Sequence, residues 1–370
     1  MGNNHSNAAP KAAPPAAPAA IVSTVPELSF YHLSDKGTVL EVYTVDQELG
    51  SGGFGKVYKV HDRDGNPFAL KMIRCKATDI ATYRKEVAVL QGLDHRNITK
   101  YKTSFELKDG TGAAICIVME LVEGADLKSV LEGSSPLPLQ VIMGIFIEIL
   151  EVLAYLHSKP IAHCDLKPAN VMIGKDNVVK LVDFGLALQL QSSMDTVNQV
   201  GGTLPYMAPE VLLAAAGKPN GFKRLVSKID IWPLGLILYE ALTSDRSWYS
   251  KPLGFTSYLE EDNKIIAKKV DDYSLALLLG KMLEINPEKR ASAQELLDSD
   301  LISGWRMALD PKHKAREKPP QTVWFVSPSV SLLTNNCHPS LVGAAISYLS
   351  KWATEIQDVR LALLQIGAVP

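Results

Sequence analysis

The sequence of 370 residues contains few cysteines, no excess of either charge and no long apolar run. Its four cysteines are widely spaced without a C-x-x-C pair, which argues against a disulfide scaffold or zinc module and indicates a reducing compartment. The 38 basic and 40 acidic residues give a net charge of −2, so no nucleic-acid partner is expected. The unbroken apolar runs, such as residues 141–147, are far shorter than the roughly 18 residues that a membrane-spanning helix needs.

The N-terminal residues are rich in alanine and proline, with eight Ala and four Pro among the first twenty. Such a segment cannot offset its ordering entropy, so residues 1–25 are expected to form a flexible tail, followed by a lead-in over residues 26–42. The opening MGNNHS fits the pattern for myristoylation of Gly2, although so short a pattern also occurs by chance. One acyl chain binds membranes only weakly. The expected location is therefore the cytoplasm, with reversible contact at the cytosolic face of a membrane.

The C-terminal residues divide into a basic, proline-bounded linker over 306–325 and a helical segment over 326–370. Apolar residues recur at helical spacing in 338–352 and 355–366. This stretch resembles the last two helices of an armadillo repeat, with a generic amphipathic helix pair as the alternative. Since one solenoid repeat cannot bury its own apolar face, we expect either that the repeat continues beyond residue 370 or that these helices pack on the preceding domain. A protein partner that binds these helices is a further expectation.

A glycine-rich motif, LGSGGFGKV, occupies residues 49–57. The G-x-G-x-x-G string alone is weak, because dinucleotide-binding domains carry it before a helix. Here residues 57–60 are rich in β-branched side chains, an Asp-Gly turn follows at 64–65, and residues 68–73 predict another strand. Two strands joined by a glycine turn form a lid under which the backbone can approach phosphate oxygens closely.

Lys71 lies in the middle of the second predicted strand among apolar neighbours, where an unpaired ammonium would be costly. One anionic partner is Glu86, on a helix predicted from about residue 79 to 91. The functional interpretation is a lysine that holds the α- and β-phosphates of a nucleotide while Glu86 positions it. The alternative is a surface lysine on an edge strand.

A second polar constellation begins with HCDLKPAN at residues 163–170 and continues with DFG at 183–185. Residues 171–173 and 178–182 flank a turn and predict a hairpin, which would bring Asn170 and Asp183 to the same edge. Amide and carboxylate oxygens suit a hard Mg²⁺ ion. Asp165 would then lie within reach of an incoming hydroxyl, and Lys167 could neutralise charge on a transferred phosphoryl group.

Taken together, these motifs resemble those of eukaryotic protein kinases over residues 43–305. The resemblance continues with GTLPYMAPE at 202–210, DIWPLG at 230–235 and Arg290 in NPEKR. It implies an α+β, bilobal protein-kinase fold with a small β-rich N-lobe carrying one key helix and a larger α-helical C-lobe, plus the short C-terminal helical segment. It also implies transfer of the γ-phosphate of ATP, with Mg²⁺ or alternatively Mn²⁺, to Ser/Thr hydroxyls of protein substrates. Lys167 and the Gly-Thr-x-x-Tyr pattern are features of the serine/threonine type.

The resemblance implies a role for each matching residue. Asp165 resembles the catalytic base and Lys167 the phosphate-stabilising lysine, while Lys71 and Glu86 resemble the ion pair of the active state. Asn170 and Asp183 resemble the metal ligands. The residues implied in nucleotide binding lie in the glycine loop, the lysine strand and the segment joining the lobes: Leu49, Gly50, Ser51, Gly52, Gly53, Phe54, Gly55, Val57, Ala69, Lys71, the gatekeeper Met119, Glu120 and Val122.

Other polar residues allow a structural interpretation. Asp126 either meets the ribose or a basic substrate residue, or it caps the helix that begins there. His163 is expected to be a packed, hydrogen-bonded histidine, and Arg290 the buried partner of Glu210.

Cys164 stands where the family usually has an arginine that pairs with a phosphorylated activation segment. A thiol cannot supply charged donors, and residues 186–203 contain no Arg or Lys. We therefore expect activity that does not require phosphorylation of Ser192, Ser193 or Thr196. Two other functions remain open: a pseudokinase-like scaffold that acts through its C-terminal helices, and a small-molecule phosphotransferase, which would lack the segment Ala208-Pro209-Glu210.

Overall fold

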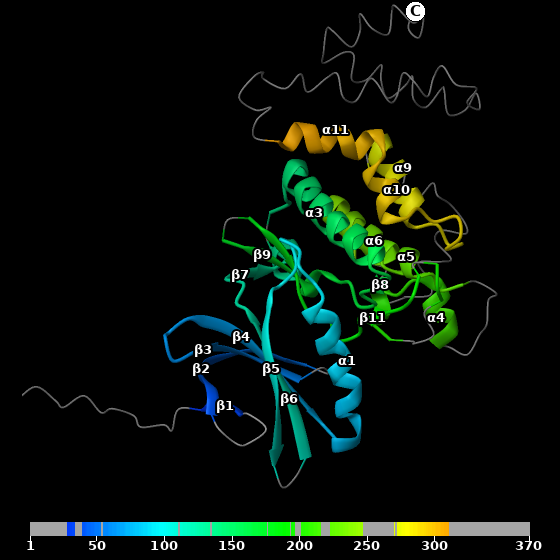
Figure 1. Ribbon diagram of the computed structural model, residues 1–370. Helices are drawn as coiled ribbons and strands as arrows, with labels where there is room; N and C mark the ends of the chain where they lie inside the picture. The colour runs from blue at the N-terminus through cyan, green and yellow to red at the C-terminus, as the bar shows by residue number, and fades with distance from the viewer. Residues whose placement is uncertain are drawn as a thin grey trace, which may run out of the picture.

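The computed structural model describes residues 28–33, 39–52, 55–109, 112–133, 135–175, 177–192, 194–196, 201–215, 223–246, 270 and 272–310 (Figure 1). Within them the chain forms a small lobe of strands with one long helix and a larger, mainly helical lobe. The predicted α+β bilobal fold is therefore confirmed. The predictions for the tail with Gly2, for Gly53 and Phe54, for the linker from residue 311 onward and for the C-terminal helices lie outside the described residues.

The N-lobe is built on an antiparallel sheet in the order β1-β2-β3-β4-β6-β5. Its strands are β1 (Ser29–Leu33), β2 (Val39–Gly52), β3 (Gly55–His61), β4 (Pro67–Cys75), β5 (Tyr101–Asp109) and β6 (Gly112–Glu120). A 3-10 turn, η1 (Ala77–Asp79), leads into helix α1 (Ile80–Gln91). The predicted hairpin around the glycine turn is present, with Gly52 opposite Gly55.

Alternation along the strands separates the two faces of this sheet. On β6, Ala113, Ile115 and Ile117 belong to the main core, which also contains residues of α1. The alternate residues Ala114, Cys116 and Val118 belong to a second, smaller cluster on the opposite face. The sheet is therefore covered on both sides, and Lys71 points to the α1 side while its neighbours Leu70 and Met72 join the second cluster.

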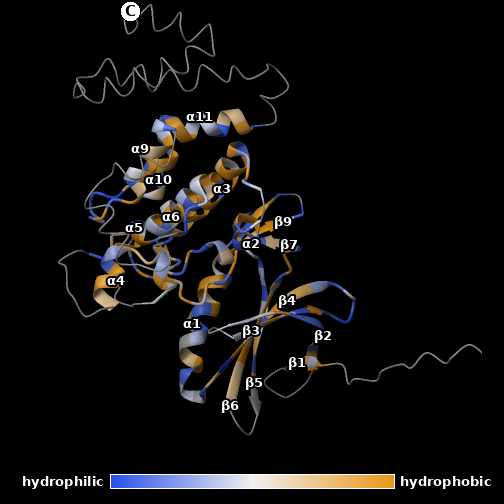
Figure 2. Cartoon of the chain, turned by 180° about the vertical axis from the view of Figure 1, so that it is seen from behind, coloured by the Kyte–Doolittle hydropathy of each residue, from blue (hydrophilic) through white to orange (hydrophobic). Residues whose placement is uncertain are grey.

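The described helices of the C-lobe are α2 (Leu127–Leu131), α3 (Leu139–Ser158), α4 (Pro209–Ala215), α5 (Val226–Ile229), α6 (Ile231–Thr243), α9 (Tyr273–Met282), α10 (Ala293–Leu297) and α11 (Asp300–Leu309). The most apolar of them, α3 and α6, lie side by side in the middle of the lobe (Figure 2). Short strands join this lobe to the catalytic motifs. They are β7 (Gly124–Asp126) with β9 (Val171–Gly174) and β10 (Val179–Leu181), and β8 (Ile161–Ala162) with β11 (Leu188–Gln189).

By length and composition α3 is apolar enough to cross a membrane, which the shorter unbroken run of residues 141–147 did not indicate. Polar residues such as Glu148 interrupt the apolar run without interrupting the helix. In the structure, most of α3 is buried against α6, α10 and α11. Its apolar surface is therefore used as the core of the C-lobe.

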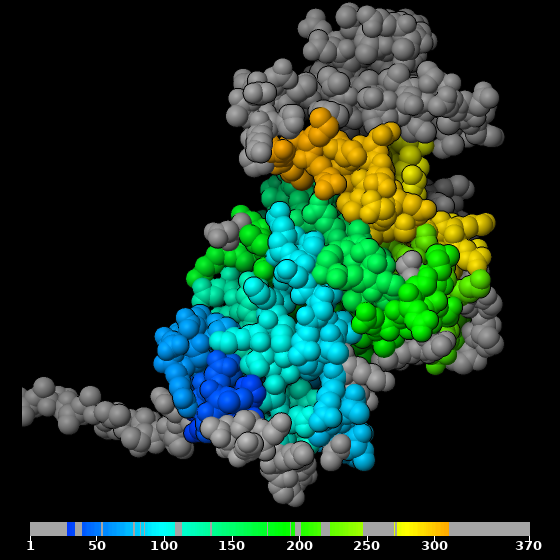
Figure 3. All heavy atoms as spheres, in the orientation of Figure 1, coloured from blue at the N-terminus to red at the C-terminus, as the bar shows by residue number. Residues whose placement is uncertain are grey.

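Two predicted boundaries fall inside elements of the structure. The lead-in over residues 26–42 contains β1 and the start of β2. Residues of β1 contact β5, and the N-terminal strands lie against the rest of the N-lobe in the space-filling view (Figure 3). The boundary at residue 305 falls inside α11, which runs to Leu309 because Ser299 caps its start and Ile302 is buried. Arg306 also forms an ion pair with Glu151 of α3 at 2.7 Å, so the linker does not begin at residue 306.

Candidate active site

The two lobes are joined by an ion-pair network centred on Lys71 of β4. Its Nζ donates to Oε1 of Glu86 on α1 at 3.0 Å and to Oδ1 of Asp183 in the C-lobe at 2.8 Å. The side chains of Lys71 and Glu86 are 7 % and 6 % exposed. The structure therefore brings three predicted site residues, far apart in the sequence, into direct contact.

Lys71 and Asp183 favour each other's charged form, whereas burial raises the pKa of Glu86 despite the ammonium of Lys71. Burial lowers the pKa of Lys71, but Asp183 and Glu86 outweigh it, so the net pKa lies above the ordinary value. Burial raises the pKa of Asp183, yet the ammonium of Lys71 holds it below its ordinary value. Asp183 is thus an anion and Lys71 a cation near neutral pH, as binding to a metal and to phosphates requires.

Gly185 is required where the network meets the backbone. A Cβ atom at this position would lie 3.0 Å from Nζ of Lys71 and 3.2 Å from Oδ1 of Asp183. Phe184 is buried, with its ring centroid 5.0 Å from that of His163. The Asp-Phe-Gly motif therefore places a charged side chain, a buried core side chain and a glycine that leaves room for the Lys71–Asp183 contact in succession.

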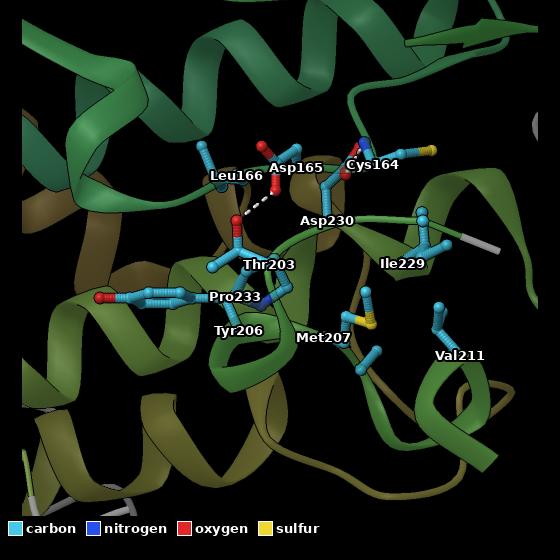
Figure 4. Close-up of a pocket in the computed structure, with 12 residues that line it drawn as sticks. Cys164, Asp165, Leu166, Thr203, Tyr206, Met207, Val211, Ile229, Asp230 and Pro233 are labelled. Atoms are coloured by element: carbon cyan, nitrogen blue, oxygen red, sulfur yellow. Dashed lines mark hydrogen bonds between the residues drawn. The ribbon is translucent and has the colours of Figure 1, made fainter. Parts of the chain in front are cut away.

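Residues 163–170, which the kinase resemblance identifies as the catalytic loop, contain Asp165, which is 5 % exposed. Nζ of Lys167 donates to Oδ2 of Asp165 at 2.7 Å and to the hydroxyl of Thr203 at 2.8 Å. That hydroxyl donates in turn to Oδ1 of Asp165 at 2.8 Å, and the two side chains point toward each other in Figure 4. Thr203 was not predicted as a site residue. The signal was its place in the Gly-Thr-x-x-Tyr pattern.

Asn170 joins Asp165 to the metal-ligand candidates. Its Nδ2 donates to the backbone oxygen of Asp165 at 2.9 Å and to Oδ2 at 3.3 Å. The predicted hairpin is present, with β9 and β10 antiparallel, and the N–H of Val182 donates to the carbonyl of Asn170 at 2.9 Å. The hairpin therefore brings Asn170 beside the residue that precedes Asp183.

These two side chains fit a hard divalent cation. The NH₂ group of Asn170 is bound to Asp165, so the amide oxygen remains for a ligand. Asp183 uses Oδ1 for Lys71, and its Oδ2 accepts no hydrogen bond from the described residues. No cluster of three His, Cys, Asp or Glu suited to a metal occurs in the described part of the chain. Mg²⁺ needs none, because one or two carboxylates and substrate phosphates suffice.

Asp230, at the start of α6, holds the catalytic loop from below. Its carboxylate accepts the N–H of His163 at 2.8 Å and that of Cys164 at 2.9 Å, and lies 3.1 Å from Nε2 of His157. Burial raises the pKa of Asp230, but the two histidines and these hydrogen bonds bring it below its ordinary value. A buried anion thus fixes the backbone immediately before Asp165.

The glycine turn and the segment joining the lobes border the same network. Val57 lies opposite Lys71 in the β3–β4 register, and Ala69 lies opposite Met119 of β6. Gly55 has φ +114°, and a Cβ there would lie 2.3 Å from the carbonyl of Met72. Leu49, Gly50, Ser51 and Gly52 extend the same turn along β2.

The segment that joins the lobes, residues 120–122, begins at the end of β6. The Glu120 side chain accepts from Lys180 at 2.8 Å and from the N–H of Lys100 at 3.2 Å. It therefore anchors the junction between the lobes. The N–H of Glu120 itself donates to the carbonyl of Lys100 at 2.9 Å, so a ligand would have to bind other backbone groups of residues 120–122.

The polar residues with open interpretations are resolved by their contacts. Asp126 caps α2, because its side chain accepts the N–H of Ser129 at 2.9 Å. His163 is fully buried against Phe184. Arg290 forms a bidentate pair with Glu210, at 2.8 and 2.9 Å, with both side chains fully buried.

The activation segment that the resemblance implies, residues 186–203, is held at its described residues by backbone pairing and by hydrogen bonds to Asp195. β11 pairs with β8, and Thr196 forms a bridge with Leu225. The carboxylate of Asp195 accepts the N–H groups of Gln191 at 3.0 Å and Ser192 at 2.8 Å. Burial, with Asp230 and Asp165 nearby, raises the pKa of Cys164, so its thiol stays neutral.

A small pocket lies between this segment and the catalytic loop. Asp165, Thr203, Met207 and Pro233 are among the residues that line it (Figure 4). Cys164 lines it too, with its sulfur pointing away from Asp165 in the same view.

Comparison with known proteins places this geometry in context. Residues 43–302 match the family model described as protein kinase domain. The chain is 35 % identical to the serine/threonine-protein kinase TIO of Arabidopsis thaliana over 268 residues, covering 71 % of this chain and 19 % of that protein. It is 33 % identical to mouse serine/threonine-protein kinase Nek4, covering 70 % and 32 %, and 32 % identical to serine/threonine-protein kinase cds1 of Schizosaccharomyces pombe, covering 69 % and 57 %. The chain thus spans less than two thirds of the length of each of these relatives.

Proposed function

This chain belongs to the protein kinase family, and we propose that it is an active serine/threonine kinase that transfers the γ-phosphate of ATP to hydroxyl groups of protein substrates. Protein kinases use ATP and a divalent cation, and the finer proposal is that this cation is Mg²⁺. The observation that carries the proposal is the contact of Lys71 with both Glu86 and Asp183, since it joins the lobes in the arrangement that phosphoryl transfer needs.

ATP would lie between the glycine turn and the C-lobe. Lys71, held by Glu86, would bind the α- and β-phosphates, and the backbone of residues 120–122 would bind the base. Val57 lies opposite Lys71, and Ala69 lies opposite Met119. Val57 and Ala69 would therefore form the apolar wall above the base. This arrangement fixes the direction in which the terminal phosphate points, which is the main protein contribution to such a reaction.

Asn170 and Asp183 would hold the cation, which would supply positive charge to stabilise the transition state. Asp165 would accept the proton of the substrate hydroxyl. Lys167 would donate to the transferred phosphoryl group. Its contact with Asp165 holds its ammonium beside the proposed base, where that group would arrive. Thr203 would keep the Asp165 carboxylate oriented toward the hydroxyl.

The test is phosphorylation of a generic basic protein by the purified chain with ATP and Mg²⁺. The wild type should phosphorylate serine and threonine, identified by mass spectrometry, and Asp183→Asn should abolish the signal. Asp126→Asn serves as a matched control, because Asp126 is engaged in capping α2. Equal phosphorylation by wild type and Asp183→Asn would refute the enzyme and favour a scaffold.

The two ends of the chain support proposals about location and partners. The MGNNHS opening supports acylation of Gly2 and reversible attachment to the cytosolic face of a membrane, with the protein otherwise cytoplasmic. The amphipathic pattern of residues 338–366 supports a protein partner at the C-terminal helices. Metabolic labelling with a myristate analogue should mark the wild type and not Gly2→Ala. Labelling of neither would contradict the proposed acylation.

A further inference from the structure

β1 precedes the residues that match the family model for the protein kinase domain, which begin at residue 43. It pairs with β2 from Ser29 opposite Thr44 to Leu33 opposite Val39. β2 is a single strand of 14 residues whose second half pairs with β3 and ends at the glycine turn. One continuous strand therefore joins β1 to the turn that would cover the phosphates of ATP.

β1 packs on the face of the sheet opposite Lys71. Phe30 is 6 % exposed, and its ring centroid lies 5.6 Å from that of Tyr58 on β3. Because side chains alternate along a strand, Tyr58 points away from the face to which its neighbour Val57 points. Phe30 thus supports, from behind, the strand that carries Val57 beside the nucleotide.

A second contact joins β1 to the far end of the sheet. The His32 ring stacks on Phe105 of β5, with centroids 5.2 Å apart and planes at 15°. Phe105 also stacks on Tyr43 of β2 at 6.1 Å. Strands β1 and β5 are the two edge strands of the sheet, so the contact between His32 and Phe105 brings the two edges together. The stacking of Phe105 on Tyr43 then supports β2 on the face opposite Lys71.

An ion-pair bridge reinforces the same closure. Lys102 of β5 lies 3.1 Å from a carboxylate oxygen of Glu41 on β2 and 3.3 Å from one of Asp62, which follows β3. Its Nζ also lies 3.9 Å from the centre of the Phe68 ring. The hairpin that carries the glycine turn is therefore fixed at its outer end by contacts that do not touch Lys71, Asp165 or Asp183.

We propose that β1 is a positioning strap for the glycine turn: Phe30 and His32 hold the β2–β3 hairpin in the geometry that binds ATP. The proposal rests on the proposed function, since it assigns ATP to the site under the turn. Loss of the strap weakens ATP binding and leaves the transfer step unchanged, because Asp165, Lys167 and Thr203 lie in the other lobe. By reciprocity, bound ATP stabilises the docked β1 by the same factor.

The experiment compares Phe30→Ala with Tyr31→Ala in the full chain. Tyr31 is the next residue of the same strand but is 50 % exposed, so it is a matched control. Titration with ATP and Mg²⁺ gives the Kd, and steady-state phosphorylation gives KM and kcat. Phe30→Ala should raise the Kd and KM for ATP about fivefold or more, within the usual range of coupling between sites. Its kcat at saturating ATP should stay near that of the wild type, as should all three constants of Tyr31→Ala.

Hydrogen exchange and a milder variant keep the proposal testable if Phe30→Ala fails to fold. His32→Ala should raise the Kd in the same direction, and ATP should slow exchange of residues 28–33 in the wild type. A variant that melts earlier yet binds ATP with wild-type affinity would overturn the strap and leave β1 a purely structural addition. If ATP affinity falls in Phe30→Ala as expected but the wild type transfers no phosphate, only the proposed function is refuted, because the titration measures ATP binding and not phosphoryl transfer.

Discussion

Replacement of Thr203 by valine tests the geometry around Asp165. Valine has nearly the shape of threonine, so packing is kept and only the hydroxyl is lost. That hydroxyl donates to Oδ1 of Asp165 and accepts from Lys167, both at 2.8 Å. A hydrogen bond to a charged group contributes about 1.5–3 kcal/mol. Since Oδ2 of Asp165 keeps Lys167 and Asn170, the loss should be about the value of one such bond.

That free energy corresponds to a decrease of about 10- to 150-fold in kcat if the orientation of Asp165 matters in the transition state. The assay is steady-state phosphorylation of a basic protein at saturating ATP. KM for ATP should not change, because Thr203 does not contact Lys71 or Asp183. Thr203→Ser retains the hydroxyl and should lose much less. Wild-type kcat in Thr203→Val, or an equal loss in both variants, would refute the reasoning.

Three further predictions concern stability, regulation and pH. Arg290→Met should lower the free energy of unfolding by about 3–5 kcal/mol in urea denaturation, because it leaves the fully buried Glu210 carboxylate unpaired. Addition of Glu210→Gln should restore part of that loss, and a stability equal to wild type in the single variant would contradict it. Replacement of Ser192, Ser193 and Thr196 together by alanine should leave peptide phosphorylation near wild type, since Cys164 supplies no charged donor for a phosphate group. Near-total loss of turnover would refute this hypothesis. The lowered pKa of Asp183 means that its carboxylate stabilises the fold above about pH 4 and loses that contribution as pH falls through the lowered value. The stability of Asp183→Asn should therefore approach that of wild type in acid, and a constant difference down to pH 2 would contradict this.

The sequence predicted which of the candidate side chains meet, because these residues lie in short motifs whose order is informative. Lys71 was assigned an anionic partner on energetic grounds, and Glu86 proved to be that partner. The hairpin of β9 and β10 was predicted from alternation and a turn, and it places Asn170 as expected. These predictions succeeded because local pattern and long-range requirement agreed at the same residues.

Features that depend on contacts across the sheet could not be predicted in the same way. Phe30 and His32 read as part of a featureless lead-in, because their value lies in Tyr58 and Phe105, which are distant in sequence. Thr203 was seen only as a mark of the kinase type, since nothing local shows that its hydroxyl meets Asp165. The domain boundary at residue 305 fell inside α11, where Arg306 pairs with Glu151 of α3, a contact that the local sequence does not indicate.

The most direct measurement of the account is the turnover of Asp165→Asn with its ATP affinity measured on the same sample. If Asp165 is the base, ATP should bind as in the wild type, because the nucleotide contacts of Lys71 and Asp183 are intact. Phosphorylation of the protein substrate should fall by about 100-fold or more, as expected for loss of a general base. Turnover equal to that of wild type, with ATP bound equally well, would contradict the assignment of the site.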